Sequence, residues 1–353
     1  MKRVEGLWKI NQLFIFIASF SIVLVTLKFA ATLLVPFLIS IVLTIILNPP
    51  LTYLEQKKIP KAVSIVMIAL LLFIPVMLFA DNIASEVKSL SANFHEITIK
   101  FEKAIESSHS YFQQFDYLYN QNLLHKFLEK SNLLDIIRQL ATQASNQFSN
   151  IFLILFTAGF MIMETDQLYS KMLKIAKEND RDANQWIEIV KKIKSYFIIK
   201  VKTSLLTSLL VFIVLWYYQI SYLYLWVSLV FFFNFIPVIG SILAAIPAVV
   251  MAGIDQGGMV ALWIALWYLG TNTLVGNILE PKIMGKGLGL SSLVIFISMT
   301  FWGWVFGPAG MILSVPLTMV LQFMFEQYDE TRWIALYLSD YNEEKIDETI
   351  NNT

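Results

Sequence analysis

The stretch FFFNFIPVIGSILAAIP, residues 231–247, decides how the whole chain is interpreted. Its three leading phenylalanines suit a lipid environment, but an asparagine, two prolines, a glycine and a serine then interrupt the apolar run. Proline removes a backbone N–H and clashes with the carbonyl one turn earlier, and glycine adopts dihedrals that other residues avoid. We therefore expect a membrane helix that breaks near Pro237 and Gly240, with Ser241 capping the second half.

The composition of the chain is that of an integral membrane protein. Of its 353 residues 57% are hydrophobic and only 15% are charged, whereas soluble proteins carry about 25% charged residues. The mean hydropathy is +0.65. Basic and acidic residues balance at 26 each, so no electrostatic footprint for nucleic acid is present. The chain has no cysteine, which rules out disulfides and thiolate chemistry.

Apolar runs of the length of a membrane helix recur along the chain and predict an all-α, polytopic fold. The runs are 10–27, 29–48, 62–80, 148–163, 203–218, 222–239, 241–254, 259–279, 291–305 and 308–325. Only Lys28 separates the first two, which we interpret as a tight hairpin. The runs within 222–254 and within 291–325 form two interrupted pairs, and each pair either crosses twice or re-enters. Counting each pair once, we expect about eight embedded segments.

Two polar stretches lie between these runs. Residues 81–147 carry apolar side chains at a spacing of three to four, which predicts amphipathic helices. Residues 164–202 also have an amphipathic helical pattern and are expected to lie on the membrane surface. They hold nine basic residues against six acidic ones, which favours the cytoplasmic side. With four spans before residue 164, both termini are expected in the cytoplasm and 81–147 outside the membrane on the opposite face.

The predicted organisation has five parts. They are three transmembrane spans in 1–80, extracytoplasmic helices in 81–147, a fourth span and an interfacial helix in 148–202, a transport core with broken helices in 203–326, and an acidic cytoplasmic tail in 327–353.

The two interrupted pairs have similar sequences. With one deletion, the glycine, the Ile-Leu and the proline of GSILAAIP at 240–247 coincide with those of GMILSVP at 310–316. Pro237 precedes the first segment and Pro308 precedes the second. Paired interruptions of this kind are typical of duplicated hairpins in transporters, where half-helix ends surround the solute.

Between the pairs, residues 268–292 bring polar side chains to a membrane segment. They include Asn272 and Asn277, followed by Glu280 and Pro281 at the expected end of the span. Polar residues at membrane depth usually face a bundle interior or a cavity, so Glu280 is the preferred candidate for a functional acid. The glycines at 285–289 lack the register of a phosphate-binding loop, and the sequence predicts no nucleotide, metal or other cofactor.

Three segments, 233–250, 277–296 and 303–321, closely resemble the AI-2E family of transporters, the autoinducer-2 exporter family, and 36–61 is similar to its second span. The resemblance implies a homo-oligomeric transporter of the bacterial inner membrane. It implies either export of a small polar or amphipathic solute such as autoinducer-2, or sodium/proton antiport. The family positions that it carries over are Pro237, Gly240, Pro247, Asn277, Pro281, Gly307, Gly310 and Pro316. The family's acid just before the linker asparagine is replaced here by Val275 and Gly276.

Candidate solute-binding or gating residues from both lines of reasoning lie in the breaks and the linker. They are Asn234, Pro237, Gly240, Ser241, Pro247, Asn272, Asn277, Glu280, Pro281, Gly307, Pro308, Gly310 and Pro316. An intramembrane enzyme is not expected, because all three histidines lie between residues 95 and 125, outside the spans. The expected partners are a small solute, coupled or not to sodium or protons, and the lipid bilayer. The remaining alternative is a membrane scaffold that uses 81–147 as a docking surface.

Overall fold

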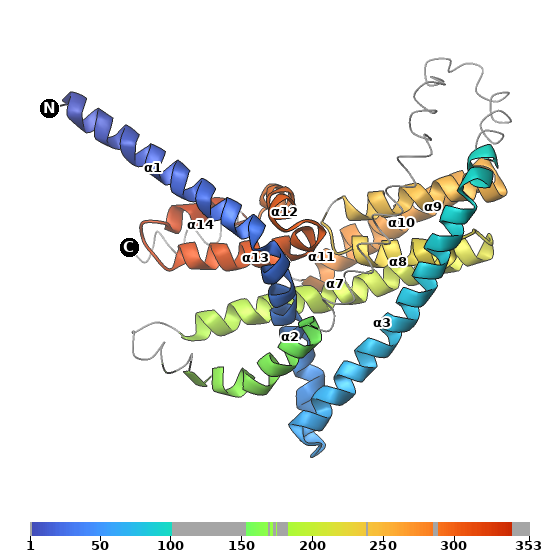
Figure 1. Cartoon of the computed structure of the whole chain (residues 1–353), viewed down its shortest axis with the longest axis horizontal. Helices are drawn as coiled ribbons and strands as arrows, with labels where there is room; N and C mark the ends of the chain where they lie inside the picture. Colours follow the sequence, from blue (N-terminus) through green and yellow to red (C-terminus); the bar gives the residue numbers. More distant parts are fainter. Residues whose placement is uncertain are drawn as a thin grey trace. The chain divides into compact units, whose positions relative to one another are not determined.

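The fold is helical throughout the part of the chain that the structure describes. The computed structural model describes residues 2–100, 153–168, 170–171, 174, 183–237, 239–284 and 289–340, and Figure 1 traces its helices in chain order. Within these ranges every regular element is a helix, which confirms the predicted all-α class. The chain forms two compact units, one from residues 1–44 and 289–353 and the other from residues 45–288.

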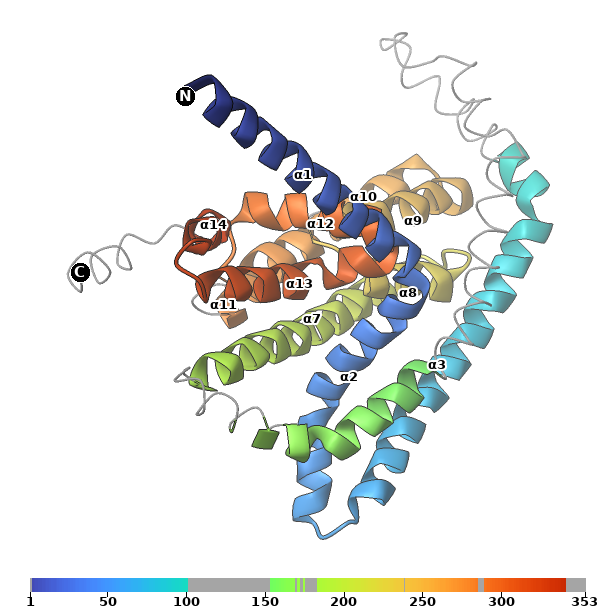
Figure 2. The ribbon, with the colours of Figure 1, turned by 60° about the vertical axis from the view of Figure 1, so that its left-hand side comes forward.

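The first unit contains the second interrupted pair. Its helices are α1 (Lys2–Phe29), the start of α2 (Ala31–Gln56), α12 (Ser292–Phe306), α13 (Pro308–Glu326) and α14 (Arg332–Leu338). Figure 2 shows α12 and α13 lying side by side. Trp302, Val305 and Phe306 of α12 form a buried apolar cluster against side chains of α1 and α2. The Lys28 ammonium lies 4.2 Å from the centre of the Trp304 ring, a cation–π contact that holds α1 to α12.

The predicted hairpin at Lys28 is wrong. The amide of Ala30 donates to the carbonyl of Thr26 at 2.9 Å, and the amide of Leu34 donates to the carbonyl of Ala30 at 2.8 Å. These are hydrogen bonds of helical spacing, so α1 passes into α2 without reversing. A lone lysine cannot turn the chain, because lysine is a good helix former and no glycine or proline stands beside it.

The second unit contains the first interrupted pair. Its further helices are α3 (Lys61–Ala92), α7 (Ala183–Tyr217), α8 (Leu223–Phe233), α9 (Gly240–Gln256), α10 (Gly258–Thr271), the π-helix η2 (Asn272–Leu279) and α11 (Glu280–Met284). An apolar core joins α7 to α10, with Leu215, Ala244 and Ile264 fully buried. Gly257, with φ of +90°, joins α9 to α10 in a single-residue turn, so these two helices lie side by side (Figure 1).

The amphipathic prediction for the start of the 81–147 stretch is confirmed. Helix α3 continues past the expected span end at residue 80 to Ala92. Val87, Leu90 and Ile97 pack against the core of α7 to α10, so this apolar face is covered by the protein itself. The remainder of the stretch, residues 101–147, lies outside the described residues.

Helix α7 joins two segments that the sequence pattern separates. It runs unbroken from Ala183 to Tyr217, across the expected boundary at 202 between an interfacial helix and a span. Tyr196 and Phe197 are buried in the protein. The expectation that residues 183–202 form a separate helix lying on the membrane surface is therefore wrong, because this segment is the first half of a long helix that packs in the core.

Four described helices are long and apolar enough to cross a membrane. They are Ala31–Gln56, Gln185–Tyr217, Gly258–Met284 and Pro308–Glu326. Five shorter apolar helices accompany them in the described ranges: Ile17–Phe29, Lys61–Leu71, Leu223–Phe233, Gly240–Gln256 and Ser292–Phe306. The chain is thus a multi-helix membrane protein, and the number of about eight embedded segments stays a prediction.

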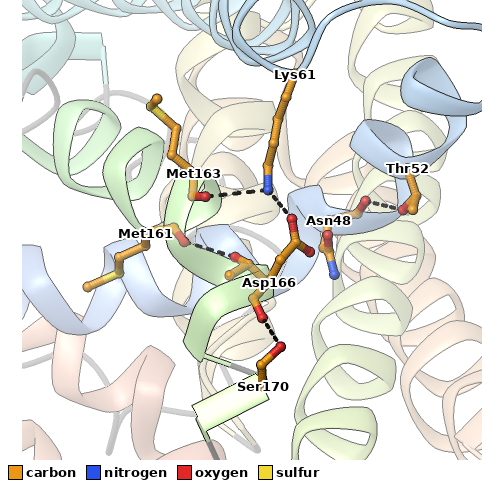
Figure 3. A network of polar contacts seen from close by, with 8 residues as sticks. Asn48, Thr52, Lys61, Met161, Met163, Asp166 and Ser170 are labelled. Carbon is orange, nitrogen blue, oxygen red and sulfur yellow. Dashed lines mark hydrogen bonds and ion pairs between the residues drawn. The ribbon is translucent and has the colours of Figure 1, made fainter.

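One surface network connects the start of α3 to the helix 153–168. The ammonium of Lys61, at the start of α3, lies 2.6 Å from the Asp166 carboxylate, and Figure 3 shows the two side chains pointing toward one another. Lys61 also donates to the carbonyl of Met163 at 3.5 Å. The start of α3 and the end of helix 153–168 therefore lie close together, and their side of the membrane stays a prediction.

Candidate functional site

The first helix break is real and wider than one residue. Helix α8 ends at Phe233 and α9 begins at Gly240, so the chain is non-helical at Asn234 and Pro237. A Cβ atom on Gly240 would lie 1.8 Å from the carbonyl oxygen of Phe233. Glycine is required here because the start of α9 touches the end of α8. The predicted cap is wrong: Ile239 holds the N-cap position of α9, no side chain caps it, and Ser241 lies inside the first turn.

The second break is a single residue. Gly307 separates α12 from α13, with φ of +67° and ψ of −152°, a conformation that side chains disfavour. Pro308 opens α13 at its first position, where the missing N–H is not needed. A Cβ atom on Gly310 would lie 1.9 Å from the carbonyl oxygen of Trp302. Gly240 and Gly310 thus perform the same task in their two pairs, which the aligned segments had predicted.

The prolines that end the aligned segments do not belong to the breaks. Pro247 lies inside α9 and Pro316 lies inside α13, where it is buried. Their assignment to the interruptions is wrong, because a helix that is packed on its neighbours tolerates a proline kink without ending.

The polar linker is a π-helix. Residues Asn272–Leu279 form η2 between α10 and α11, and the amide of Glu280 donates to the carbonyl of Val275, five residues earlier. The expected span end at Glu280 and Pro281 is wrong, because the helix continues to Met284. The wider π-turn suits Pro281, which has no N–H to donate and whose ring would crowd the carbonyl of Asn277 in an α-helix. π-turns are rare and are frequent at functional sites.

Glu280 is buried and paired with a lysine from α7. A carboxylate oxygen of Glu280 lies 2.5 Å from the ammonium of Lys200, and the two side chains are 12% and 10% exposed. The hydroxyl of Thr203 donates to the other carboxylate oxygen at 3.3 Å. The preferred acidic candidate is therefore an inward-facing charge, held by two residues that the sequence did not single out.

The same lysine reaches the first break. Lys200 donates to the backbone carbonyl of Asn234 at 3.3 Å. The Asn234 side chain donates through Nδ2 to the hydroxyl of Ser204 at 3.0 Å. The break therefore supplies a non-helical carbonyl and a side-chain amide to a polar cluster that we call the α7 cluster: Lys200, Thr203, Ser204, Asn234 and Glu280.

The structure brings together only some of the predicted residues. Asn234 and Glu280 meet in the α7 cluster. Pro237, three residues after Asn234, is buried. Asn272 is half-buried, whereas Asn277 and Pro281 are exposed. The side-chain oxygen of Asn272 lies against Gly276, 3.1 Å from the position that a Cβ atom on Gly276 would take. The four candidates Gly307, Pro308, Gly310 and Pro316 belong to the other compact unit.

Lys200 was missed because the sequence pattern assigned residues 164–202 to a surface helix, whereas Thr203 and Ser204 lie in the expected span 203–218 but were not singled out there. The missed signal is a polar stripe at helical spacing. Lys200, Thr203, Ser204, Thr207 and Ser208 share one face of a helix that is otherwise apolar enough to cross the membrane.

A carboxylate from α3 holds the other end of α8. Glu86 accepts hydrogen bonds from the amides of Leu225 at 2.6 Å and Tyr224 at 3.3 Å, in the first turn of α8. Burial raises the pKa of the Glu86 carboxyl, and these two hydrogen bonds lower it in part. Helix α8 is therefore anchored by Glu86 at its start and by the α7 cluster just beyond its end.

Acidic and histidine side chains do not gather into a metal site within the described ranges. No group of three such residues lies close enough there to hold an ion. The chemistry of the α7 cluster is that of hydrogen bonding and of one internally neutralised charge pair.

Comparison with known proteins gives one consistent result. The family described as AI-2E family transporter matches residues 14–330 of the chain. The AI-2 transport protein TqsA of Escherichia coli (strain K12) is 31% identical over 333 residues, which cover 94% of this chain and 97% of that protein. A putative transport protein of Haemophilus influenzae is 31% identical, with 93% and 96% covered. The putative transport protein YhhT of Escherichia coli (strain K12) is 28% identical, with 88% and 89% covered.

Proposed function

The chain belongs to the AI-2E family of transporters, and on this premise we propose that it is a secondary transporter that exports a small polar solute, with autoinducer-2 as the first candidate. The name of the Escherichia coli relative supports this choice of solute. A small polar solute needs hydrogen-bonding partners inside the membrane, because the hydrocarbon core offers none.

The observation that carries the proposal is the α7 cluster. A buried Lys200–Glu280 pair, two hydroxyls and the opened backbone at Asn234 converge at one point of a helix that is long enough to span the membrane. Removing charges from water is costly, and such groups at membrane depth usually serve transport rather than stability. A backbone carbonyl at the break of a helix is the kind of group that binds solutes in transporters.

The first interrupted pair is proposed to re-enter. Helix α8 has 11 residues and is about 16 Å long, whereas the hydrocarbon core is about 30 Å thick. A half-helix of this length ends within the membrane, where its last carbonyls meet the α7 cluster. Cytoplasmic termini, a bacterial inner-membrane location and a homo-oligomeric state complete the proposal, and they rest on charge distribution and on family membership.

Reconstituted flux tests the proposal. Liposomes that contain the purified protein are loaded with autoinducer-2. The release of autoinducer-2 is compared with its release from protein-free liposomes and from liposomes that contain the Glu280→Gln variant. We expect release through the wild-type protein and at least a tenfold lower rate through Glu280→Gln. A rate of autoinducer-2 release equal to that of protein-free liposomes would exclude autoinducer-2 as the solute.

A sodium/proton antiporter is the second candidate, and the buried carboxylate of Glu280 is the observation that favours it. The same liposomes, with a pH-sensitive dye inside and a sodium gradient imposed, measure this activity. Proton movement that depends on sodium and is lost in Glu280→Gln would establish antiport. A scaffold role is less favoured, because Val87, Leu90 and Ile97 already pack against the core of their own chain.

A further inference from the structure

One face of α7 carries a continuous line of buried polar side chains that extends beyond the α7 cluster. Each of its members is at most 8% exposed: Tyr196, Lys200, Thr203, Ser204, Thr207 and Ser208. We call this set the α7 stripe. The opposite face holds Leu205, Leu209 and Ile213, which are 56%, 56% and 48% exposed, as expected of side chains that meet lipid.

The stripe faces a second polar element. Glu280 contacts Lys200 and Thr203, whereas Trp267 donates from its indole N–H to the carbonyl of Leu210 at 3.0 Å. Helix α7 and the continuous α10–η2–α11 helix therefore run antiparallel. This register places the buried Tyr268 near the level of Ser208.

Three hydroxyls in this region are buried without a hydrogen-bond partner among the described residues. They belong to Tyr196 and Ser208 of the stripe and to Tyr268 of α10. Serine and threonine in a membrane helix normally satisfy themselves on the carbonyl four residues earlier, as Thr207 does on Thr203 at 2.8 Å. An unpaired buried hydroxyl loses its hydrogen bonds to water without replacement, which destabilises the folded state. Unpaired groups at both ends of one stripe leave hydrogen-bonding capacity that a bound solute or water can fill.

We propose that the α7 stripe and Tyr268 line the solute pathway, and that the pathway takes a neutral solute rich in hydroxyl groups. The inference rests on the proposed transport function and adds to it the route and the class of solute. Hydroxyls donate and accept, so they match a hydroxylated solute at successive positions. The stripe rises about 18 Å between Tyr196 and Ser208 at the helical rise per residue, a large part of the membrane core.

The charge balance of the stripe selects the class of solute. Lys200 is the one charged member of the stripe, and the Glu280 carboxylate that pairs with it neutralises its charge. A cation or an anion would have to break this pair, whereas a neutral solute hydrogen-bonds along the remaining hydroxyls without doing so.

Single cysteines test the route, since the natural chain contains none. Ser208→Cys and the matched lipid-facing Leu209→Cys are treated in membranes with methanethiosulfonate ethylammonium, a small charged thiol reagent. We expect Ser208→Cys to react at least ten times faster, and autoinducer-2 to slow that reaction. Equal rates at the two positions overturn the route. Protection by sodium chloride but not by autoinducer-2 overturns the neutral class of solute.

Removal of the unpaired hydroxyls separates transport from folding. Tyr196→Phe and Tyr268→Phe delete one oxygen each, and Tyr217→Phe, on the exposed end of α7, is the matched control. A purely structural hydroxyl without a partner leaves stability equal or higher when it is removed, with transport intact. We expect unchanged or higher thermal midpoints together with at least a fivefold loss of flux in the first two variants and none in the third. Wild-type flux in Tyr196→Phe and Tyr268→Phe overturns the inference.

The two tests fail independently of the proposed function. If wild-type liposomes release no autoinducer-2, the choice of solute is wrong, yet the Ser208→Cys and Leu209→Cys rates still show whether the stripe is a wet pathway. If release occurs while Ser208→Cys is as inert as Leu209→Cys, transport stands and the route is wrong.

Discussion

The ammonium of Lys200 lies 2.5 Å from a carboxylate oxygen of Glu280, and this pair joins the middle of α7 to the start of α11. When backbone and side chain are taken together, both residues are less than a tenth exposed. A buried pair in which each charge is the main partner of the other stabilises little as a pair but strongly opposes the loss of one member. The pair also holds the non-helical carbonyl of Asn234 through Lys200.

The first prediction concerns this charge pair. Lys200→Met leaves the Glu280 carboxylate buried and unpaired, and we expect a loss of about 3–5 kcal/mol in unfolding free energy. The double variant Lys200→Met/Glu280→Met is expected to recover most of that loss, because no charge then stays buried. Thermal midpoints in detergent measure both, with the exposed Lys282→Met as control. A double variant no better than Lys200→Met alone would show that the two side chains are not coupled.

The second prediction concerns the two glycines of the aligned segments, which lie in the first turn of the helix that follows each break. Gly240→Ala and Gly310→Ala would place a Cβ within 2 Å of a backbone carbonyl oxygen, at 1.8 and 1.9 Å. We expect each to cost about 1–3 kcal/mol or more, because the half-helices must move apart. Gly270→Ala, in an open part of α10, should instead stabilise by about 0.5–1 kcal/mol. Folded yield and thermal midpoint are the readouts, and equal behaviour of all three variants would refute the close contact.

The third prediction concerns the turn between α12 and α13. Gly307 has φ of +67°, and its Cβ would meet no atom within 4 Å, so backbone strain alone opposes a side chain there. We expect Gly307→Ala to cost about 1–3 kcal/mol. Gly258→Ala, which also begins a helix and has an ordinary φ, is the control and should be close to neutral. The difference between their thermal midpoints checks the prediction, and it would vanish if the turn relaxed freely.

The fourth prediction concerns the pH dependence of the anchor on α8. The pKa of Glu86 is raised from 4.5, so the folded state binds this proton more tightly than the unfolded state. The contribution of Glu86 to stability is then fully present below pH 4.5 and is lost as the pH rises through the folded-state pKa. Glu86→Gln should remove this slope and keep an oxygen for the Leu225 amide.

A nearby glutamate gives the control with the opposite sign. Lys100 lowers the pKa of the exposed Glu96 through a hydrogen bond and its charge. The contribution of Glu96 is therefore present above pH 4.5 and is lost as the pH falls through the lowered value. Thermal midpoints from about pH 3 to pH 8 should show a pH slope lost above pH 4.5 in Glu86→Gln and one lost below pH 4.5 in Glu96→Gln. Identical profiles for the two variants would contradict the burial of Glu86.

The fifth prediction concerns the exposed pair at the end of the second unit. Lys61 and Asp166 are close, at 2.6 Å, but the Asp166 side chain is 85% exposed. Water and salt screen such a pair, so Asp166→Ala should change the unfolding free energy by only about 0.2–1 kcal/mol. The change should shrink further at high salt. A loss comparable to that of Lys200→Met would mean that this contact has a role beyond surface pairing.

The backbone features of this protein are decided by local sequence. Gly240 begins α9 after the first break and Gly310 lies in the first turn of α13 after the Gly307 break, and both occupy the aligned positions of the two segments. The membrane class and the amphipathic face of the helix that follows residue 80 likewise come from composition and spacing. The same local rules wrongly assigned Pro247 and Pro316 to the helix breaks, because both prolines lie inside the intact helices α9 and α13.

Only the tertiary structure decided which side chains meet. The sequence identified Glu280 as the preferred acid, but its partner Lys200 lies far away in the chain within a stretch whose charge pattern indicated a surface helix. Pairing of this kind depends on the register between two packed helices, and that register is set by many apolar contacts spread along α7, α8 and α10. No short segment contains this information, so the polar face of α7 emerges only when the helices are packed.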